Sequence, residues 1–345
     1  MKIFRVILLT ALLFAAAPAC ERHSKDSGED DKINVPDDET HVDPSSTTLL
    51  DLFKLKIAEY RNDATIPTNH VFICAHRANT YSSSQKQIPE NSVRCIEEAI
   101  AQGADMVELD VRVTSDGVPM LMHDEKVNTT TNGKGTLSEM TFDQVRALRM
   151  KYRGTTTPYR EDGKEILVPT LAEALKACKG KIYVNLDVKD CPVSTLMKAI
   201  RDAGVIDEVM IYGLSTSEKK ECIVWAFENV GKWIAVHPYI GSPDDYKNYV
   251  QGFYDCAKLF QYNGATYYNA TVSGFGYKCH ANGVLSYSNS LDYDSQIRDW
   301  YTKYYLNNIE APCRVLDQFI ASGSDFVQTD VFELAQFYFK SKGLR

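Results

Sequence analysis

The feature that most constrains the fold is the alternation of short apolar runs with amphipathic segments from about residue 49 onward. Short, continuous apolar runs are typical of strands that are buried on both faces. The intervening segments have helical spacing, and one of them, LAEALKAC, follows Thr170 as a helix cap. The sequence predicts eight strands, at residues 71–76, 106–111, 182–189, 208–215, 233–240, 265–271, 284–290 and 325–330.

Strands that alternate with helices predict an α/β fold with parallel strands. Eight such strands in a domain of this length fit a closed (β/α)8 barrel. An open, doubly wound sheet is the alternative. The run at 71–76 is not followed by a glycine-rich phosphate loop, since the next glycine is Gly103.

The N-terminus reads as an export signal. Lys2 and Arg5 precede an apolar stretch that is short for a membrane-spanning helix, and small residues then lead to Cys20. This resembles a bacterial lipoprotein signal with a lipobox, in which the cysteine becomes lipidated; an ordinary secretory signal is the alternative. Residues 21–48 are polar and acidic, which predicts a flexible tether before a domain at 49–345. We therefore expect an exported lipoprotein, held at a membrane through Cys20 and facing the periplasm or the cell surface.

The net charge limits the kinds of partner that the protein can bind, and the cysteines limit its possible disulfides. The net charge is −8 and no lysine or arginine cluster occurs, which argues against a nucleic-acid partner. No protein partner is indicated. Export permits disulfides, and Cys178 with Cys191, or Cys279 with Cys313, could pair. Cys74 and Cys95 lie in apolar patterned segments, and we expect both to be buried thiols.

Carboxylates stand at the ends of two predicted strands. Glu108 and Asp110 are two residues apart and therefore point the same way, and Asp187 with Lys189 repeats this spacing on the next strand. In a barrel these side chains would converge at the C-terminal mouth, where catalytic groups lie. A divalent cation would relieve their repulsion, and ligands that are all oxygens favour Ca²⁺ or Mg²⁺. The alternative is a set of structural ion pairs with Arg77, Arg112 or Lys189.

Two histidines lie near these acids in the sequence. His76 ends the first predicted strand, and His123 follows the second after a turn. Imidazole takes and gives protons near neutral pH, so two histidines beside a metal suit acid–base cleavage of a phosphate ester. Arg77 and Lys189 could hold the phosphate oxygens.

A family resemblance runs through these residues. The segments AHRAN, PENS, GADMVELDVRVTSDGVPMLMHDEKV, TNGKG, VPTLAEAL, NLDVK and DFVQTD occur in the order seen in glycerophosphodiester phosphodiesterases. The resemblance covers roughly residues 70–340. It implies a TIM barrel with a small insertion after the second strand, and it places His123 in that insertion.

The resemblance also implies roles for the site residues. His76 and His123 match the acid–base histidines of the family, and Glu108 and Asp110 match its metal ligands. Asp187 matches the third metal ligand, which is usually a glutamate.

The chain departs from the family at other positions as well. Ala78 stands where glycine is usual after His76 and Arg77, and Ser286-Tyr287 replaces a late tryptophan–threonine pair. The late changes put the usual alcohol pocket in doubt.

We therefore predict a metal-dependent hydrolase that cleaves a glycerophosphodiester, or a related small phosphodiester, to an alcohol and glycerol 3-phosphate. One alternative keeps the chemistry but acts on a glycerophosphoinositol, a phospholipid or a wall-polymer phosphodiester. Another alternative is a catalytically silent barrel that binds a glycan or a phosphodiester at the cell surface.

Overall fold

The computed structural model describes residues 48–49, 51–52, 56, 70–80, 87–236, 239–240, 259–262, 276, 279–280, 285–307 and 311–345. The predicted signal, the predicted tether up to residue 47 and the run at 265–271, the sixth expected strand, lie outside the described residues. Within the described ranges, no helix is both long and apolar enough to cross a lipid bilayer.

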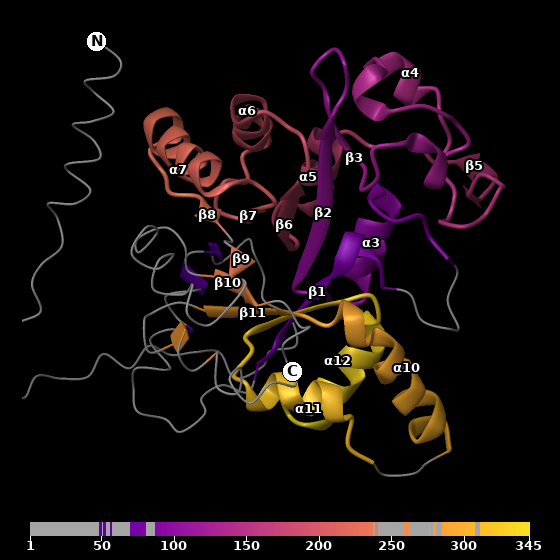
Figure 1. Cartoon of the computed structure of the whole chain (residues 1–345), viewed down its shortest axis with the longest axis vertical. Helices are drawn as coiled ribbons and strands as arrows, with labels where there is room; N and C mark the ends of the chain where they lie inside the picture. Colours follow the sequence, from indigo (N-terminus) through magenta and orange to yellow (C-terminus); the bar gives the residue numbers. More distant parts are fainter. Residues whose placement is uncertain are drawn as a thin grey trace, which may run out of the picture. The chain divides into compact units, whose positions relative to one another are not determined.

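Parallel strands form the centre of the domain (Figure 1). Their order across the sheet is β8-β7-β6-β2-β1-β12-β11-β10-β9, and every pairing along this path is parallel. The strands are β1 (Phe72–Ala75), β2 (Met106–Val113), β6 (Tyr183–Val188), β7 (Val209–Tyr212), β8 (Ala235–Val236), β9 (Tyr239–Ile240), β10 (Leu259–Tyr262), β11 (Leu285–Asn289) and β12 (Phe326–Thr329).

The strands at the two ends of this order, β8 and β9, are neighbours in the sequence. Only two residues separate β8 from β9, so the row of parallel strands returns to its start and closes. Counted as one strand, β8 and β9 complete a barrel of eight among the described residues. The first and last strands pair directly, with Phe72 opposite Phe326. The prediction of a (β/α)8 barrel is confirmed, and the open-sheet alternative is wrong because an open sheet leaves its two edges apart. The sixth strand is β10.

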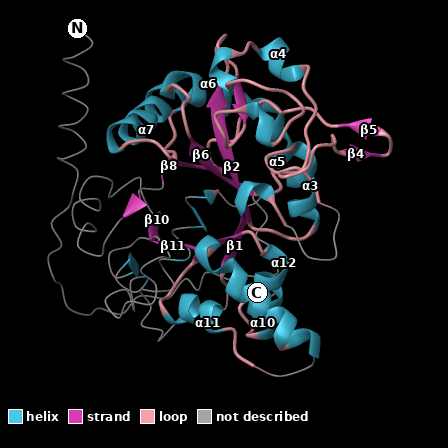
Figure 2. Ribbon diagram, turned by 45° about the vertical axis from the view of Figure 1, so that its right-hand side comes forward, coloured by secondary structure: helices cyan, strands magenta, loops and turns pink. Residues whose placement is uncertain are grey.

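Helices follow the strands on the outside of the sheet (Figure 2). Thr170 caps its helix as predicted, because its hydroxyl accepts from Glu173 N and the Glu173 carboxylate accepts from Thr170 N. Ser215 and Glu218 form the same capping box. The helices outside the insertion include α3 (Val93–Ala101), α5 (Leu171–Cys178), α6 (Val193–Ala203), α7 (Thr216–Val230), α10 (Asp294–Lys303), α11 (Arg314–Ala321) and α12 (Phe332–Ser341).

Residues 114–170 form the predicted insertion between β2 and α5. β3 (Pro119–Leu121) pairs antiparallel with β2, and the short turns η2 (Val127–Thr129) and η3 (Leu137–Glu139) follow. α4 (Phe142–Arg146) and the hairpin of β4 (Arg160–Glu161) and β5 (Lys164–Glu165) complete it. It has an apolar cluster of its own, made of Met120, Met122, Val127, Leu137, Val145, Met150 and Val168. His123 lies in this insertion, directly after β3.

Alternation along the strands separates two apolar layers. On β1 and β2, Ile73 and Val107 face the helices and join the large core between sheet and helices. Their neighbours Phe72 and Met106 join a second cluster, together with Tyr183 and Phe326, that fills the barrel interior. Continuing the alternation from Met106 brings the even-numbered residues of β2 to the interior, nearer the C-terminal end. The site therefore lies above an apolar plug.

The seven described cysteines are free and buried. Cys74 and Cys95 are buried thiols, as expected. Neither suggested disulfide is present: Cys178 and Cys191 are separate thiols, and so are Cys279 and Cys313. Burial raises the pKa of Cys191 to about 12, so this thiol stays protonated at neutral pH.

Candidate active site

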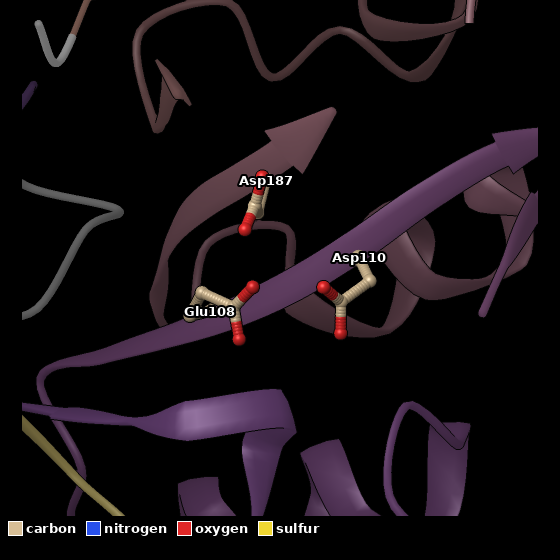
Figure 3. Close-up of side chains that lie close together, drawn as sticks. All are labelled: Glu108, Asp110 and Asp187. Carbon is tan, nitrogen blue, oxygen red and sulfur yellow. The ribbon is translucent and has the colours of Figure 1, made fainter. Parts of the chain in front are cut away.

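Three carboxylates meet on two neighbouring strands (Figure 3). Glu108 and Asp110 come from β2, and Asp187 comes from β6. In the parallel register Asp110 lies opposite Asp187, and alternation puts Glu108 on the same face as Asp110. One oxygen from each carboxylate lies within 4.8 Å of the others. The structure thus brings together the three predicted metal ligands, which we call the acidic triad.

The acidic triad has the character of a cation site. Burial raises the pKa of Glu108 to about 8, and the charges of Asp110 and Asp187 act in the same direction. Asp110 is 1% exposed, and its Oδ1 accepts no hydrogen bond in the described part of the chain, although Lys189 Nζ lies 3.2 Å from it. A buried carboxylate oxygen that accepts no hydrogen bond, among further carboxylates, fits a hard divalent ion that binds oxygen. Glu108, Asp110 and Asp187 are therefore the residues that could hold Ca²⁺ or Mg²⁺.

Backbone turns fix two of these ligands. Asn91 donates from Nδ2 to Asp110 Oδ2 (2.7 Å), and Asp110 N donates to Asn91 Oδ1 (3.0 Å). The backbone N–H of Arg77 donates to Glu108 Oε2 (2.8 Å). Asn91 and Arg77 both have positive φ, 54° and 52°, so each turn directs a donor at a carboxylate. Groups that orient ligands in this way affect metal affinity strongly.

The alternative of structural ion pairs involved Arg77, Arg112 or Lys189. Two of these three residues approach the acidic triad. Lys189 Nζ lies 2.6 Å from Asp187 Oδ2 and 3.2 Å from Asp110 Oδ1. Arg77 Nε lies 3.7 Å from Asp110 Oδ2. Arg112 pairs instead with Asp190 (2.7 Å). The acidic triad is thus partly neutralised by the positive charges of Lys189 and Arg77.

His76 lies between the acidic triad and the end of β12. It begins the short turn η1 (His76–Ala78) after β1. Its Nδ1 is 2.8 Å from Asp330 Oδ1, and its Nε2 is 3.9 Å from Glu108 Oε2. Burial opposes protonation, but the hydrogen bond to Asp330 and the charge of Glu108 raise the pKa of His76 above its usual value. A proton on Nδ1 is held by Asp330, which leaves Nε2 directed toward the acidic triad.

His123 is connected to the site less directly. Its Nδ1 lies 2.7 Å from Asp124 Oδ1, and Arg153 Nη1 lies 3.2 Å from Asp124 Oδ2. Arg153 also binds Glu90, which in turn binds Arg77. Among the described residues, His76, Arg77 and Lys189 contact the acidic triad directly. His123 reaches it only through this chain of charged groups.

A pocket of about 270 Å³ adjoins His76. His76 and Asp330 line it, together with Glu90, Arg153 and Arg298. Sequence reasoning assigned no role to the last four. Asp330 carried a signal, because it ends a strand with the polar DFVQTD pattern, and Glu90 lies in PENS. Arg153 and Arg298 have no local pattern that separates them from surface arginines.

A (β/α)8 barrel with an acidic cation site at its mouth defines a broad class of metal-dependent enzymes. Within this chain, residues 76–228 match the model of the "Glycerophosphoryl diester phosphodiesterase family". This segment belongs to that family, as the motifs predict.

Curated relatives agree over part of their length. Glycerophosphodiester phosphodiesterase 1 of Mus musculus is 39% identical over 124 residues, which cover 36% of this chain and 35% of that protein. A glycerophosphodiester phosphodiesterase of Caldanaerobacter subterraneus is 31% identical over 146 residues, covering 40% of this chain and 56% of that protein. The match thus spans about a third of the mammalian relative and about half of the bacterial one.

Solved structures share the fold over more of the chain. A glycerophosphoryl diester phosphodiesterase from Parabacteroides distasonis has a TM-score of 0.61 at 19% identity, covering 83% of this chain and 92% of that one. A phosphodiesterase from Oleispira antarctica, solved with the product sn-glycerol-3-phosphate, has a TM-score of 0.55 at 20% identity. It covers 78% of this chain and 96% of its own. At these identities the likeness concerns the fold.

Proposed function

We propose that the protein is a metal-dependent phosphodiesterase that hydrolyses a glycerophosphodiester, or a related small phosphodiester, to an alcohol and glycerol 3-phosphate. The observation that carries the proposal is the position of His76, between Asp330 and the Glu108 carboxylate of an oxygen-only acidic triad. The family match of residues 76–228 supports it. The product named for the Oleispira structure is the one expected here.

The acidic triad and its cations would bind the phosphate. Glu108, Asp110 and Asp187 would hold one Ca²⁺ or Mg²⁺, which supplies positive charge to a phosphate oxygen when bound. Lys189 and Arg77 lie beside the acidic triad, with Nζ 2.6 Å from Asp187 and Nε 3.7 Å from Asp110. Their charges suit the remaining phosphate oxygens.

The two histidines would divide the proton transfers. Asp330 holds the Nδ1 side of His76, so Nε2 is the atom that exchanges a proton with the substrate. Asp124 holds His123 through Nδ1 in the same way. One imidazole would take the proton of the attacking hydroxyl, from water or from the substrate itself, and the other would return a proton to the leaving alcohol. If the substrate's own hydroxyl attacks, a cyclic phosphate forms, and water would then open it to give glycerol 3-phosphate. Such transfers contribute about 10²- to 10⁴-fold in rate.

The test measures glycerol 3-phosphate release from glycerophosphoglycerol by purified protein treated with EDTA and then supplied with Ca²⁺ or Mg²⁺. We expect release only with the cation present. His76→Ala and His123→Ala should each lower kcat by about 10²-fold or more. His41→Ala, which changes a histidine of the predicted tether, serves as the matched control and should keep full activity.

Two results would contradict the proposal. Release that persists in EDTA would remove the role of the acidic triad, and wild-type rates in both histidine variants would remove the acid–base pair. Absence of release from several diesters, combined with retention on a glycan column, would favour a silent binding barrel.

We further propose that the protein is exported and held at a membrane through a lipid on Cys20. The basic residues, apolar stretch and small residues before Cys20 support this. Labelling of bacterial cells with a palmitate analogue should mark the wild type and leave Cys20→Ala unmarked. A labelled Cys20→Ala protein would exclude this residue as the lipid site.

A further inference from the structure

The pocket beside His76 has an unusual lining for a site that receives an organic alcohol. Apart from Tyr152, whose ring is apolar, every described residue that lines it is charged, an imidazole or an amide, and its volume is about 270 Å³. Pockets for larger organic ligands have mainly apolar walls and volumes of about 300–1,000 Å³. The pocket therefore suits a small polar group and lacks the wall that an acyl chain would need.

The charges of the lining are unequal. Three guanidinium groups, of Arg77, Arg153 and Arg298, face two carboxylates, of Glu90 and Asp330. Glu90 is shared between Arg77 (2.9 Å) and Arg153 (2.7 Å). Asp330 is occupied by His76 at 2.8 Å. Both acids are thus already engaged by cations. Arg77 and Arg153 also approach Asp110 and Asp124 outside the lining, and the lining itself has one more guanidinium group than carboxylates.

The position of Arg298 is fixed by the helix that carries it. Asp294, one turn earlier on α10, accepts hydrogen bonds from Asp330 N (2.7 Å) and from the Thr329 hydroxyl (2.8 Å). These bonds tie the start of α10 to the end of β12. Side chains four residues apart lie on the same helix face, so Arg298 is held over the same strand end as Asp330.

We propose that this pocket selects diesters whose variable alcohol carries a second anionic group, a phosphate monoester, over neutral or cationic alcohols. The proposal rests on the proposed phosphodiesterase function and names its substrate class. Guanidinium groups bind phosphate through paired, charge-assisted hydrogen bonds. A quaternary ammonium alcohol would meet positive charge instead, because the carboxylates that could bind it are taken.

The experiment compares three diesters that differ in the charge of one alcohol. They are glycerophosphoglycerol, the same diester with a further phosphate on its free glycerol, and glycerophosphocholine. We expect wild-type kcat/KM to be highest for the phosphorylated diester and lowest for glycerophosphocholine. A charge-assisted contact is worth about 1.5–3 kcal/mol, so the ratio between the first two should be roughly 10- to 100-fold.

Arg298→Gln should reduce that ratio by about 10-fold. The matched control is Arg314→Gln, an exposed arginine on α11 that does not line the pocket, and it should keep the wild-type ratio. Equal kcat/KM for the phosphorylated and neutral diesters would overturn the proposal. So would an Arg298→Gln variant that loses activity on both diesters in the same proportion.

If no diester is turned over, the phosphodiesterase function fails but the pocket can still be judged. Calorimetry with the same three diesters and the His123→Ala protein then measures binding alone. Tighter binding of the phosphorylated diester that depends on Arg298 would support the selection, and equal affinities would overturn it.

Discussion

Ala78 has a backbone conformation that favours glycine. Its φ is +57°, in the left-handed region, and it is fully buried. Arg77 before it also has positive φ, and this pair of residues directs the Arg77 N–H to Glu108. An L-residue pays about 1–2 kcal/mol in this region, which accounts for the glycine usual at this place in the family. Some strain is therefore held next to His76.

Replacing Ala78 by glycine relieves this strain but also removes a buried methyl group. A matched control separates the two effects. The matched control is Ala75→Gly, also fully buried, at an ordinary φ of −77°. Each substitution increases the conformational entropy of the unfolded chain, which lowers the free energy of unfolding by about 0.5–1 kcal/mol. Only Ala78→Gly also relieves backbone strain. We expect Ala78→Gly to be more stable than Ala75→Gly by about 1–2 kcal/mol in urea unfolding. Equal losses would show that position 78 is unstrained.

At the scale of elements, the insertion is a small folded unit attached to the barrel. It has its own apolar cluster and carries His123. Leu137 at its centre is fully buried, as is Leu196 on α6 in the main core. The two leucines therefore report on two different parts of the domain.

Leu137→Ala should open the insertion before the barrel unfolds. Truncating a buried leucine costs about 2–5 kcal/mol. We expect faster hydrogen exchange across residues 114–170 and lower turnover, with exchange in β2 and β6 little changed. Leu196→Ala should speed exchange in the barrel as well. Uniform exchange changes in both variants would mean that the insertion and the barrel unfold as one unit.

The contact between α10 and β12 depends on a carboxylate that resists ionisation. Burial raises the pKa of Asp294 to about 6, although hydrogen bonds from Ser290, Thr329 and Asp330 N oppose this. The folded protein then binds this proton more tightly than the unfolded chain does. Asp294 consequently makes folding less favourable as the pH rises through the window from about 4 to above 6.

Between pH 5 and pH 7, this group should lower the free energy of unfolding by about 1 kcal/mol. Asp294→Asn keeps a carbonyl oxygen for the Asp330 N–H but does not titrate. Urea unfolding at the two pH values should therefore show a steeper decline in the wild type than in Asp294→Asn. Parallel declines would assign the pH dependence to other groups.

At the scale of the whole molecule, the acidic triad couples folding to cation binding. A ligand at 100 times its Kd stabilises a protein by about 2.7 kcal/mol if it binds only the folded state. We expect Ca²⁺ or Mg²⁺ to raise the Tm of EDTA-treated protein. Asp187→Asn should lose most of this rise, while Asp202→Asn, an acid on α6 outside the acidic triad, should keep it. A rise in Tm that survives in Asp187→Asn would place the cation elsewhere.

Local patterns in the sequence predict most of the barrel and the acidic triad. Strand alternation alone puts Glu108 and Asp110 on one face, and the next strand of the barrel, β6, brings Asp187 opposite Asp110. Asp330 has no such local relation to His76, because their contact joins residues 254 positions apart through the pairing of the first and last strands. Barrel closure creates this contact, so only the folded chain reveals it.

Other features of the structure could not be predicted from the sequence, for different physical reasons. The strand β10 at 259–262 was not predicted, because its pattern is no stronger than that of the aromatic run at 265–271, which lies outside the described residues. An arginine on an amphipathic helix, such as Arg298, looks the same whether it faces solvent or a pocket. Export permits disulfides, yet the described cysteines are buried separately.

The residues of the site and the pocket come from different parts of the chain, and this has an evolutionary consequence. His76, the acidic triad and His123 all come from the segment that matches the family, whereas Arg298 and Asp330 come from beyond residue 228. Descendants of one ancestral barrel that keep Asp330 could therefore inherit the same reaction while other positions in the last third of the gene change. In such a lineage, changes in α10 would alter which alcohol is accepted, and the catalytic strands would be left untouched.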